Sequence, residues 1–310
     1  MSPHRIIIVA GSPRSGTTAV GDLLSIGRSV GSLYEPLNFH VGCRQINRYF
    51  EFPGQDGFSV ESLESLVDGV KGLTLSFKRG GFPEDRGWKG LVKDIVGGRP
   101  YVTYLACKIN PFLKTVVWKD PFVSFLCGYL AEKHGIPSLV TLRSPWAVAG
   151  SFKRLGWSFD LERIAVGAGK LGFVFDDLKP YFVVGDDSPV KNAALLWAML
   201  YSSVLQSLDK SSLVNLVDLD QVVSNPVETY EKLYRQVGLM WTPSVAEKIR
   251  RFYSGSEVRS SEPRSGVAHD WKRDFSQVNR YYRKLLTPDE ISFVTEVCGN
   301  AWESAKGKCL

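Results

Sequence analysis

The stretch from Arg5 to Leu24, RIIIVAGSPRSGTTAVGDLL, constrains the fold of this chain more than any other stretch. An apolar run is followed by a glycine-containing turn, and the residues after Gly16 are typical of the start of a helix. Gly11 and Gly16 have the spacing of a nucleotide phosphate loop. In such a loop backbone N–H groups surround an anion, and the following helix adds its positive end. The sequence therefore predicts a strand, a phosphate-binding loop and a helix.

The residue after Gly16 separates this loop from those of nucleotide-hydrolysing proteins. Those proteins have a lysine there that reaches the terminal phosphates, whereas this chain has Thr17, and the basic residue of the loop is Arg14. Ser15, Thr17 and Thr18 add hydroxyl donors. ATP-dependent transfer uses that lysine together with Mg²⁺ to neutralise the γ-phosphoryl group. A sulfuryl group carries less negative charge, so the loop suits sulfuryl transfer without a metal.

Four apolar runs predict the strands of a parallel sheet; they are Arg5–Val9, Thr115–Trp118, Ser138–Leu142 and Leu213–Leu219. Helices are predicted between the strands, with well-signalled starts at Ser144, Asn225 and Thr287. The apolar segment Ala193–Leu208 is interpreted as a buried core helix. This alternation is typical of an α/β fold of three layers, a phosphate-loop type with a central parallel sheet flanked by helices. We expect one domain over residues 1–310, with 41–114 as an acceptor-side insertion.

Composition and charge limit the classes of function. The chain is 44% hydrophobic and 23% charged, with a net charge of +6, which suits a globular protein with an anionic ligand. No run of basic residues with interleaved aromatic residues indicates a nucleic-acid partner. The five cysteines form no C-x-x-C pair and the four histidines lack metal-ligand spacing. We expect a cytoplasmic protein with no signal peptide, no metal and no transmembrane segment.

A second anion-binding element is predicted in residues 138–157, SLVTLRSPWAVAGSFKRLGW. Arg143 follows the expected strand, and Ser151 lies two turns into the expected helix. Ligands of open α/β sheets bind at the carboxyl ends of the strands. An arginine and a serine there are suited to holding a second phosphate group.

Both elements resemble motifs of the sulfotransferases that use 3′-phosphoadenosine 5′-phosphosulfate (PAPS). The SPRSGTT loop resembles the 5′-phosphosulfate loop of that family, and LRSPWAVAGSFKRL resembles its 3′-phosphate motif. The resemblance implies that Arg14–Thr18 bind the 5′-phosphosulfate. It also implies that Arg143 and Ser151 bind the 3′-phosphate of the donor, which leaves as adenosine 3′,5′-bisphosphate.

A third motif of that family resembles Arg264–Ser276, RSGVAHDWKRDFS. Cytosolic members carry R-K-G-x-x-G-D-W-K-N-x-F-T, and the match implies that Arg264 and Gly266 also contact the 3′-phosphate. This chain departs from the family pattern at two positions, where Ser265 replaces the lysine and His269 replaces a glycine. The order and separations of the three motifs agree with the family.

Glu35 is the candidate general base. The element LYEP, which contains Glu35 and Pro36, resembles the Glu-Pro element of carbohydrate sulfotransferases, especially the 6-O-sulfating type. In related bacterial enzymes the glutamate is the proposed base. Proline predicts an extended backbone at Glu35. His40 is a rival base.

Besides Glu35, the catalytic candidates are Arg14, which is expected to stabilise charge on the leaving phosphate, and Lys119 in the segment VVWKDPF. Cytosolic small-molecule sulfotransferases have a histidine at the comparable place, and its absence here favours Glu35. Two interpretations of Lys119 are equally favoured. The lysine stabilises charge on the transferring group, or it pairs with Asp120 or another carboxylate.

Together these features predict an enzyme that moves a sulfuryl group from PAPS to a hydroxyl group by in-line transfer. We expect the acceptor to be a small molecule or glycan, with a carbohydrate or glycoconjugate favoured by LYEP alone. Lipids, peptides and polyketide-type metabolites stay open as acceptors. Two alternatives also stay open: a nucleotide or sugar kinase of the phosphate-loop type, and a non-catalytic nucleotide-binding protein. The sequence does not predict the oligomeric state.

Overall fold

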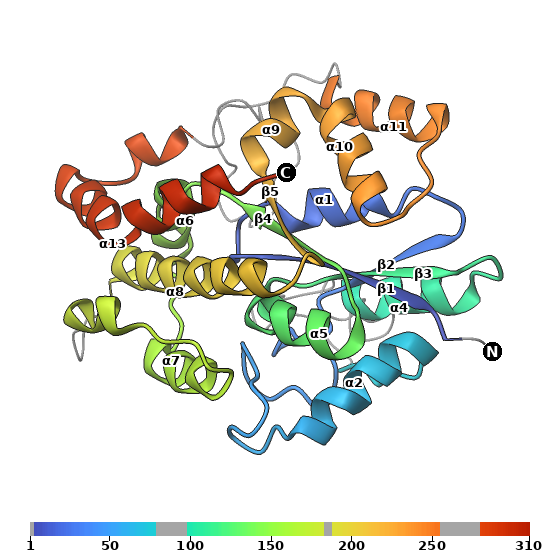
Figure 1. Cartoon of the computed structure of the whole chain (residues 1–310), viewed down its shortest axis with the longest axis horizontal. Helices are drawn as coiled ribbons and strands as arrows, with labels where there is room; N and C mark the ends of the chain where they lie inside the picture. Colours follow the sequence, from blue (N-terminus) through green and yellow to red (C-terminus); the bar gives the residue numbers. More distant parts are fainter. Residues whose placement is uncertain (1–2, 79–97, 183–187, 255–279) are drawn as a thin grey trace, which may run out of the picture.

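A computed structural model describes residues 3–78, 98–182, 188–254 and 280–310 of the chain (Figure 1). Its centre is a parallel sheet with the strand order β2-β3-β1-β4-β5. The strands are β1 (Arg5–Gly11), β2 (Val30–Tyr34), β3 (Thr115–Lys119), β4 (Ser138–Leu142) and β5 (Val214–Asp218). The predicted α/β fold, a parallel sheet flanked by helices, is confirmed.

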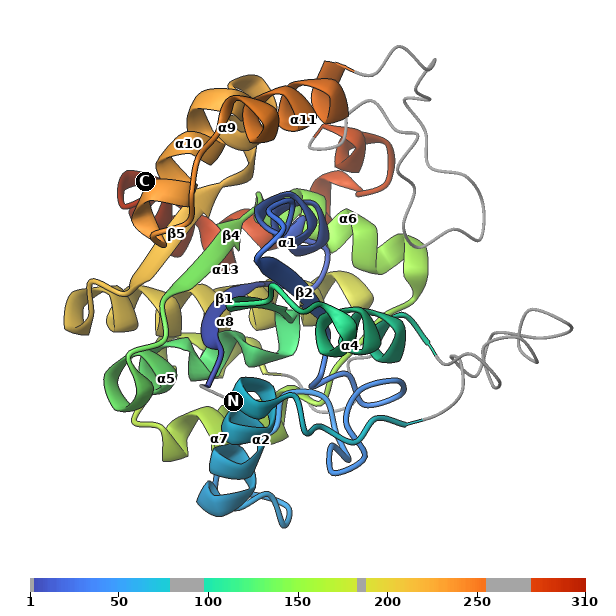
Figure 2. The ribbon, with the colours of Figure 1, turned by 90° about the vertical axis from the view of Figure 1, so that its right-hand side faces the viewer.

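Alternate residues of each strand face opposite layers, because successive side chains of a strand point to opposite faces. Ile7 and Val9 of β1 pack into one core, and Ile6 and Ile8 pack into the other. Figures 1 and 2 show helices on both sides of the sheet. The first core is covered by α1 (Thr17–Leu24), α9 (Leu219–Ser224), α10 (Pro226–Gln236) and α11 (Pro243–Ser254).

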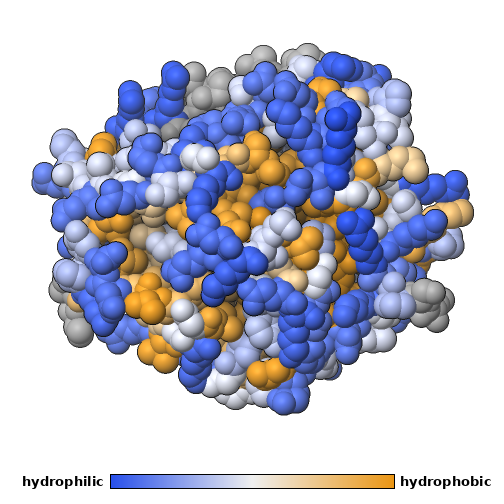
Figure 3. Space-filling model, viewed as in Figure 1, coloured by the Kyte–Doolittle hydropathy of each residue, from blue (hydrophilic) through white to orange (hydrophobic). Residues whose placement is uncertain are grey.

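The second core is larger and contains the long helix α8 (Pro189–Lys210), of which thirteen residues are buried. The other elements of this layer are α2 (Val60–Gly72), α4 (Arg99–Ile109), η1 (Pro121–Leu126), α5 (Cys127–His134), α6 (Pro145–Leu155), α7 (Leu161–Lys170), η2 (Asp176–Tyr181), η3 (Tyr281–Lys284) and α13 (Pro288–Gly307). The prediction of a buried core helix over Ala193–Leu208 is confirmed. The described part of the chain contains no helix with the length and apolar character of a membrane span. On the face in Figure 3, polar side chains surround separate apolar patches.

Strands β1 and β3 are neighbours whose following segments leave the sheet toward opposite faces. From β1 the chain enters α1, whereas from β3 it enters η1 and α5. In a doubly wound sheet, ligands bind at the carboxyl ends of the strands where the strand order reverses. This point lies between Gly11, the last residue of β1, and Lys119, the last residue of β3.

The apolar runs of the sequence do not predict β2. Gly31 and Ser32 interrupt its pattern, and its first three residues are only half-buried because β2 is an edge strand. Helix α4 covers that edge, where the Thr103 hydroxyl accepts the N–H of Tyr34 at 3.1 Å. Both α2 and α4 belong to the expected insertion 41–114, whose acceptor-side role stays a prediction.

Two predicted helix starts have the capping hydrogen bonds expected for them. The Ser144 hydroxyl accepts the N–H of Ala147 at the start of α6. Thr287 and Glu290 form a capping box at the start of α13, in which each side chain accepts the backbone N–H of the other residue. The third predicted cap is wrong in detail, because α10 begins at Pro226 and the Asn225 side chain accepts no N–H of its first turn.

Candidate active site

The predicted phosphate loop lies between β1 and α1. Three of its residues have a positive φ, which is 144° at Gly11, 74° at Arg14 and 84° at Gly16. A Cβ at Gly16 would also lie 2.8 Å from the Leu219 side chain, so this position requires glycine. Because the N-cap residue is glycine, no N-cap side chain bonds the first N–H groups of α1. Those groups and the helix dipole are suited to an anion.

Buried hydroxyl groups hold the loop in this shape. The Ser124 hydroxyl of η1 accepts the N–H of Gly11 at 2.9 Å. The Ser15 hydroxyl lies 2.8 Å from the Thr141 hydroxyl of β4, which donates to the Ala10 carbonyl. In the structure the Ser15 side chain is fully buried and bonded inside the fold, so it helps to shape the loop. The predicted contact of Ser15 with the ligand stays a prediction.

Arg14 joins the two predicted anion-binding elements. Its Nε donates to the Ser151 hydroxyl of α6 at 3.1 Å, and its backbone carbonyl accepts from Arg143 Nη1 at 2.7 Å. Its guanidinium carbon also lies 5.9 Å from the centre of the Trp157 ring. Arg143 is buried, and its own carbonyl accepts from Trp197 Nε1 at 3.0 Å. Arg14, Arg143 and Ser151, which we call the arginine cluster, therefore form one hydrogen-bonded unit at the ends of β1 and β4.

Glu35 and Lys119 form a buried ion pair on the other side of β1. Lys119 Nζ donates to Glu35 Oε1 at 2.6 Å, and the Lys119 side chain is 1% exposed. The ammonium group also lies 3.6 Å from the centre of the Tyr34 ring. Of the two interpretations of Lys119, pairing with a carboxylate is therefore observed, and the carboxylate is that of Glu35. The pair brings two predicted catalytic residues together at the ends of β2 and β3.

The predicted extended backbone at Glu35 is wrong, because its φ is 43° and lies in the left-handed region. A non-glycine residue in this region is strained, and hydrogen bonds on both sides of Glu35 stabilise the conformation. The Glu35 N–H donates to the Lys119 carbonyl at 2.7 Å, and its carbonyl accepts the N–H of Asn38 at 3.1 Å. The Asn38 side chain donates to Glu35 Oε2 at 2.7 Å. Asn38 is thus a site residue that the sequence analysis missed.

The remaining predicted residues lie as follows. Thr17 and Thr18 are buried in the first turn of α1. His40, the rival base, has its ring 4.8 Å from that of Phe39 and 5.7 Å from that of Tyr49. Arg264 and Gly266, with the whole third motif, lie outside the described residues.

The contact between α1 and Lys119 depends on glycine. A Cβ at Gly21 would lie 2.7 Å from Lys119 Cγ. We expect Gly21→Ala to destabilise the protein by about 1–3 kcal/mol, because the Lys119 side chain must move. Gly299→Ala in α13 is the matched control, since a Cβ there meets nothing within 4 Å. Denaturant unfolding of both variants measures the difference, and equal stabilities would contradict the predicted contact.

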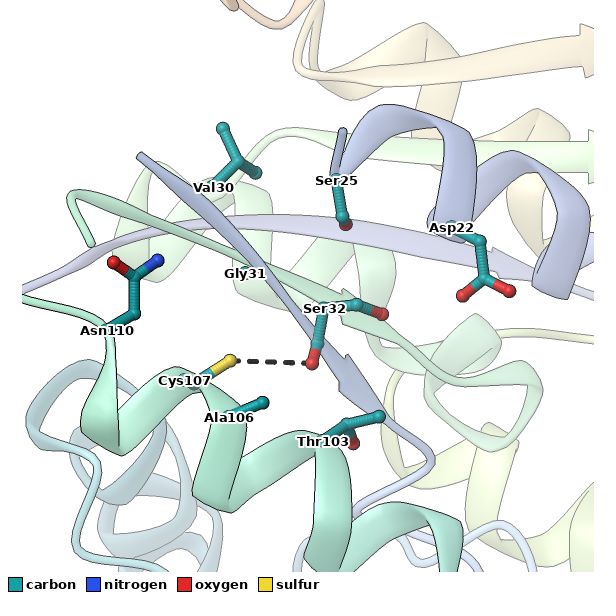
Figure 4. A pocket seen from close by; sticks show the side chains of 9 residues that line it. All are labelled: Asp22, Ser25, Val30, Gly31, Ser32, Thr103, Ala106, Cys107 and Asn110. Atoms are coloured by element: carbon teal, nitrogen blue, oxygen red, sulfur yellow. Dashed lines mark hydrogen bonds between the residues drawn. The ribbon is translucent and has the colours of Figure 1, made fainter. Parts of the chain in front are cut away.

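A separate pocket of about 340 Å³ lies at the edge of the sheet, between the end of α1, β2 and α4 (Figure 4). Figure 4 shows Cys107 of α4 bonded to the backbone of Ser32 within it. The pocket is lined by Asp22, Ser25, Val30, Gly31, Ser32, Thr103, Ala106, Cys107 and Asn110. None of these lining residues belongs to the predicted site.

Comparison with solved structures finds sulfotransferases. The sulfotransferase domain of the curacin biosynthetic pathway aligns over 96% of this chain and 97% of its own, with 15% identity and a TM-score of 0.47. Sulfotransferase STF9 from Mycobacterium avium aligns over 98% of this chain and 77% of its own, with 13% identity and a TM-score of 0.48. Mouse sulfotransferase SULT7A1, complexed with PAP, aligns over 98% and 88%, with 14% identity and a TM-score of 0.44.

No family model matches the chain, and no curated protein sequence matches it. The structural likenesses have low identities and TM-scores below 0.5. The reaction of this chain is therefore argued from the residues of the site and not from these likenesses.

Proposed function

We propose that this protein is a PAPS-dependent sulfotransferase that sulfates a hydroxyl group, with Glu35 as general base. The observation that carries this proposal is the arginine cluster, in which Arg14 is bonded to both Arg143 and Ser151. It places cationic groups beside the phosphate loop, as a donor with phosphates at both ends of a nucleotide requires. The buried Glu35–Lys119 pair lies at the neighbouring strand ends.

The proposed reaction assigns a role to each group. Glu35 takes the proton of the acceptor hydroxyl while the oxygen of that hydroxyl attacks sulfur. The bond between sulfur and the leaving phosphate oxygen breaks as this attack proceeds. Backbone N–H groups of the phosphate loop and Arg14 stabilise the charge that develops on the leaving phosphate. Arg143 and Ser151 hold the 3′-phosphate, and Arg264 and Gly266 are proposed to assist them.

The ion pair links the base to the leaving group. A proton on Glu35 removes the charge that holds Lys119 Nζ at 2.6 Å. Lys119 is then released to donate to the leaving oxygen as that oxygen becomes negative. The same lysine thus acts as the partner of the base before transfer and as a stabiliser of charge during it.

The aromatic residues near the site support an acceptor with a ring. A row of ring contacts runs through His40, Tyr49, Phe159, Phe152 and Trp157, with ring centres 5.5 to 6.1 Å apart. It begins at His40, in the segment that follows the Glu35 turn, and ends at Trp157, whose ring centre lies 5.9 Å from the guanidinium carbon of Arg14. Aromatic faces with a few polar groups are typical of small-molecule sites. We therefore propose a small-molecule or glycan acceptor, with a sugar ring as the favoured class.

Incubation with PAPS and extracts tests the proposed function. We expect adenosine 3′,5′-bisphosphate to form, together with a product whose mass has increased by one SO₃ group. Glu35→Gln is the control protein. Binding of ATP but not of adenosine 3′,5′-bisphosphate would favour the kinase alternative. Binding of the bisphosphate without any transfer would favour a non-catalytic protein.

Transfer is expected to proceed without a divalent metal. The residue after Gly16 is Thr17, so the loop lacks the lysine that works with Mg²⁺ in phosphoryl transfer. With excess EDTA the protein should keep most of its rate, while a Mg²⁺-dependent kinase assayed beside it should lose its activity. Loss of transfer on chelation, with recovery on adding Mg²⁺, would contradict this mechanism.

A further inference from the structure

The segment after β3 contacts both halves of the site. Lys119 pairs with Glu35, and Ser124 bonds the first residue of the phosphate loop. Between them lies Asp120, whose carboxylate is 0% exposed. The mechanism proposed above gives Asp120 no role.

The Asp120 carboxylate holds backbone groups on two segments. Its Oδ2 accepts the N–H of Leu37 at 2.6 Å, two residues after Glu35, and its Oδ1 accepts the N–H of Phe122 at 2.9 Å at the start of η1. Trp118 Nε1 lies 3.4 Å from Oδ2. The bond to Leu37 fixes the far end of the Glu35–Leu37 turn, while the Lys119 carbonyl fixes its near end.

We propose that Asp120 is a positioning residue for the general base: it holds the Glu35–Leu37 turn and, by its charge, makes the Glu35 carboxylate a stronger proton acceptor. This inference rests on the proposed function only in naming Glu35 as the base. Two nearby carboxylates of like charge each favour protonation of the other. A proton arriving on Glu35 therefore relieves the repulsion between them.

The groups around Asp120 affect its pKa in the way that this coupling to Glu35 requires. Burial, followed by the charge of Glu35, raises the pKa of Asp120 to about 7, against the opposing effects of the Leu37 and Phe122 N–H groups and of Lys119. Cys43, from the segment after the Glu35 turn, also faces this group, and burial followed by the charge of Asp120 raises the pKa of its thiol. In the described part of the chain, Glu35 and Lys119 are the charged groups that act on Asp120, and Cys43 is a titratable group on which Asp120 acts.

A double-mutant cycle tests the positioning role. We expect Asp120→Asn to lower kcat by roughly 10- to 100-fold, because the base is displaced, with little change in affinity for adenosine 3′,5′-bisphosphate. In the Glu35→Gln background the same change should have almost no further effect, because Asp120 acts through Glu35. Additive losses, or an unchanged kcat in Asp120→Asn, would overturn the proposal.

Asp218→Asn is the matched control. Asp218 is also a buried carboxylate at a strand end, and its Oδ1 accepts the N–H of Asp220 at 3.0 Å. Its other oxygen pairs with Lys306, far from Glu35 in the strand order. We expect this variant to lose stability but to keep a kcat close to that of the wild type. An equal loss of kcat in both variants would show that Asp120 acts only through stability.

The pH dependence gives a second readout. Wild-type kcat should rise as the pH increases through about 7, where Asp120 gains its charge. Asp120→Asn should lack this step, since the variant has no group there that ionises. A step that stays unchanged in the variant would contradict the proposal.

A titration without turnover separates this inference from the proposed function. Carboxyl ¹³C resonances should place the Asp120 titration near pH 7 in the wild type and at lower pH in Glu35→Gln, because one of the charges that raise the pKa is gone. This measurement needs neither an acceptor nor an Asp120 variant. An unmoved Asp120 titration overturns the coupling. Absence of sulfuryl transfer by the wild type overturns the proposed function and leaves this titration as the test of the coupling.

Discussion

Glu35→Gln should lower kcat for sulfuryl transfer by about 10² to 10⁴, the usual contribution of a general base. Glutamine keeps the size of the side chain and an oxygen that accepts from Asn38 or Lys119, but it cannot take the proton of the acceptor. The affinity for adenosine 3′,5′-bisphosphate should change little, because the arginine cluster is held by bonds of Arg14 with Ser151 and Arg143, whereas the Glu35 carboxylate bonds Lys119 and Asn38. Turnover and calorimetric binding measure the two effects separately.

Stability must be measured beside activity, because Lys119 loses its ion-pair partner in this variant. Breaking a buried pair commonly costs about 3–5 kcal/mol, and nucleotide binding will show whether the fold survives. Glu51→Gln is the matched control, since Glu51 is also a buried carboxylate, and it accepts the N–H groups of Asn47 and Arg48. Its kcat should stay near that of the wild type. Near-normal turnover in Glu35→Gln would remove Glu35 from the mechanism and promote His40.

The parts of the fold that local patterns specify were predictable from the sequence. From Ile6 to Gly11, strand β1 is a run of residues buried on both faces, and the loop after it is specified by glycines at positions with positive φ. Apolar runs of this kind are typical of central parallel strands. The edge strand β2 has no such run, because a half-buried strand tolerates Gly31 and Ser32. Capping residues and prolines indicated three helix starts, at Ser144, Asn225 and Thr287.

The contacts of the candidate site were less predictable because they join residues distant in sequence. Glu35 and Lys119 are 84 positions apart, and they meet only because β2 pairs with β3. Since the sequence did not predict β2, it left the partner of Lys119 open. The left-handed backbone of Glu35 also depends on tertiary hydrogen bonds, which override the local preference of a residue before proline.

The sequence around Asp120 indicates its local role at a helix start, but it does not indicate the contact of Asp120 with the Glu35 turn. Asp120-Pro121 is a helix-start pattern, and the Asp120 side chain does accept the N–H of Phe122 at the start of η1. The second bond, to Leu37, crosses 83 positions of sequence. A capping pattern alone does not indicate it, so the link between Asp120 and the base became apparent only from the fold.

Arg143→Ala should weaken binding of adenosine 3′,5′-bisphosphate far more than binding of adenosine 5′-phosphate. If Arg143 holds the 3′-phosphate, its loss removes a charge-assisted hydrogen bond of roughly 1.5–3 kcal/mol, which is about 10- to 150-fold in affinity. The variant also loses the bond from Arg143 to the Arg14 carbonyl, and any disturbance of the loop by that loss should affect both nucleotides alike. The ratio of the two affinities therefore isolates the 3′-phosphate contact.

Lys153→Ala provides the control for net charge in that comparison. Lys153 is a cation of the same helix, α6. It forms an ion pair with Glu290 at 2.7 Å and is not a member of the arginine cluster. Calorimetry with both nucleotides should give nearly wild-type affinities for this variant, since a half-exposed cation contributes little at moderate salt. Equal weakening of both nucleotides by Arg143→Ala would remove Arg143 from the 3′-phosphate site. The role of Arg143 would then be limited to holding the carbonyl of Arg14, and the 3′-phosphate would depend on other residues.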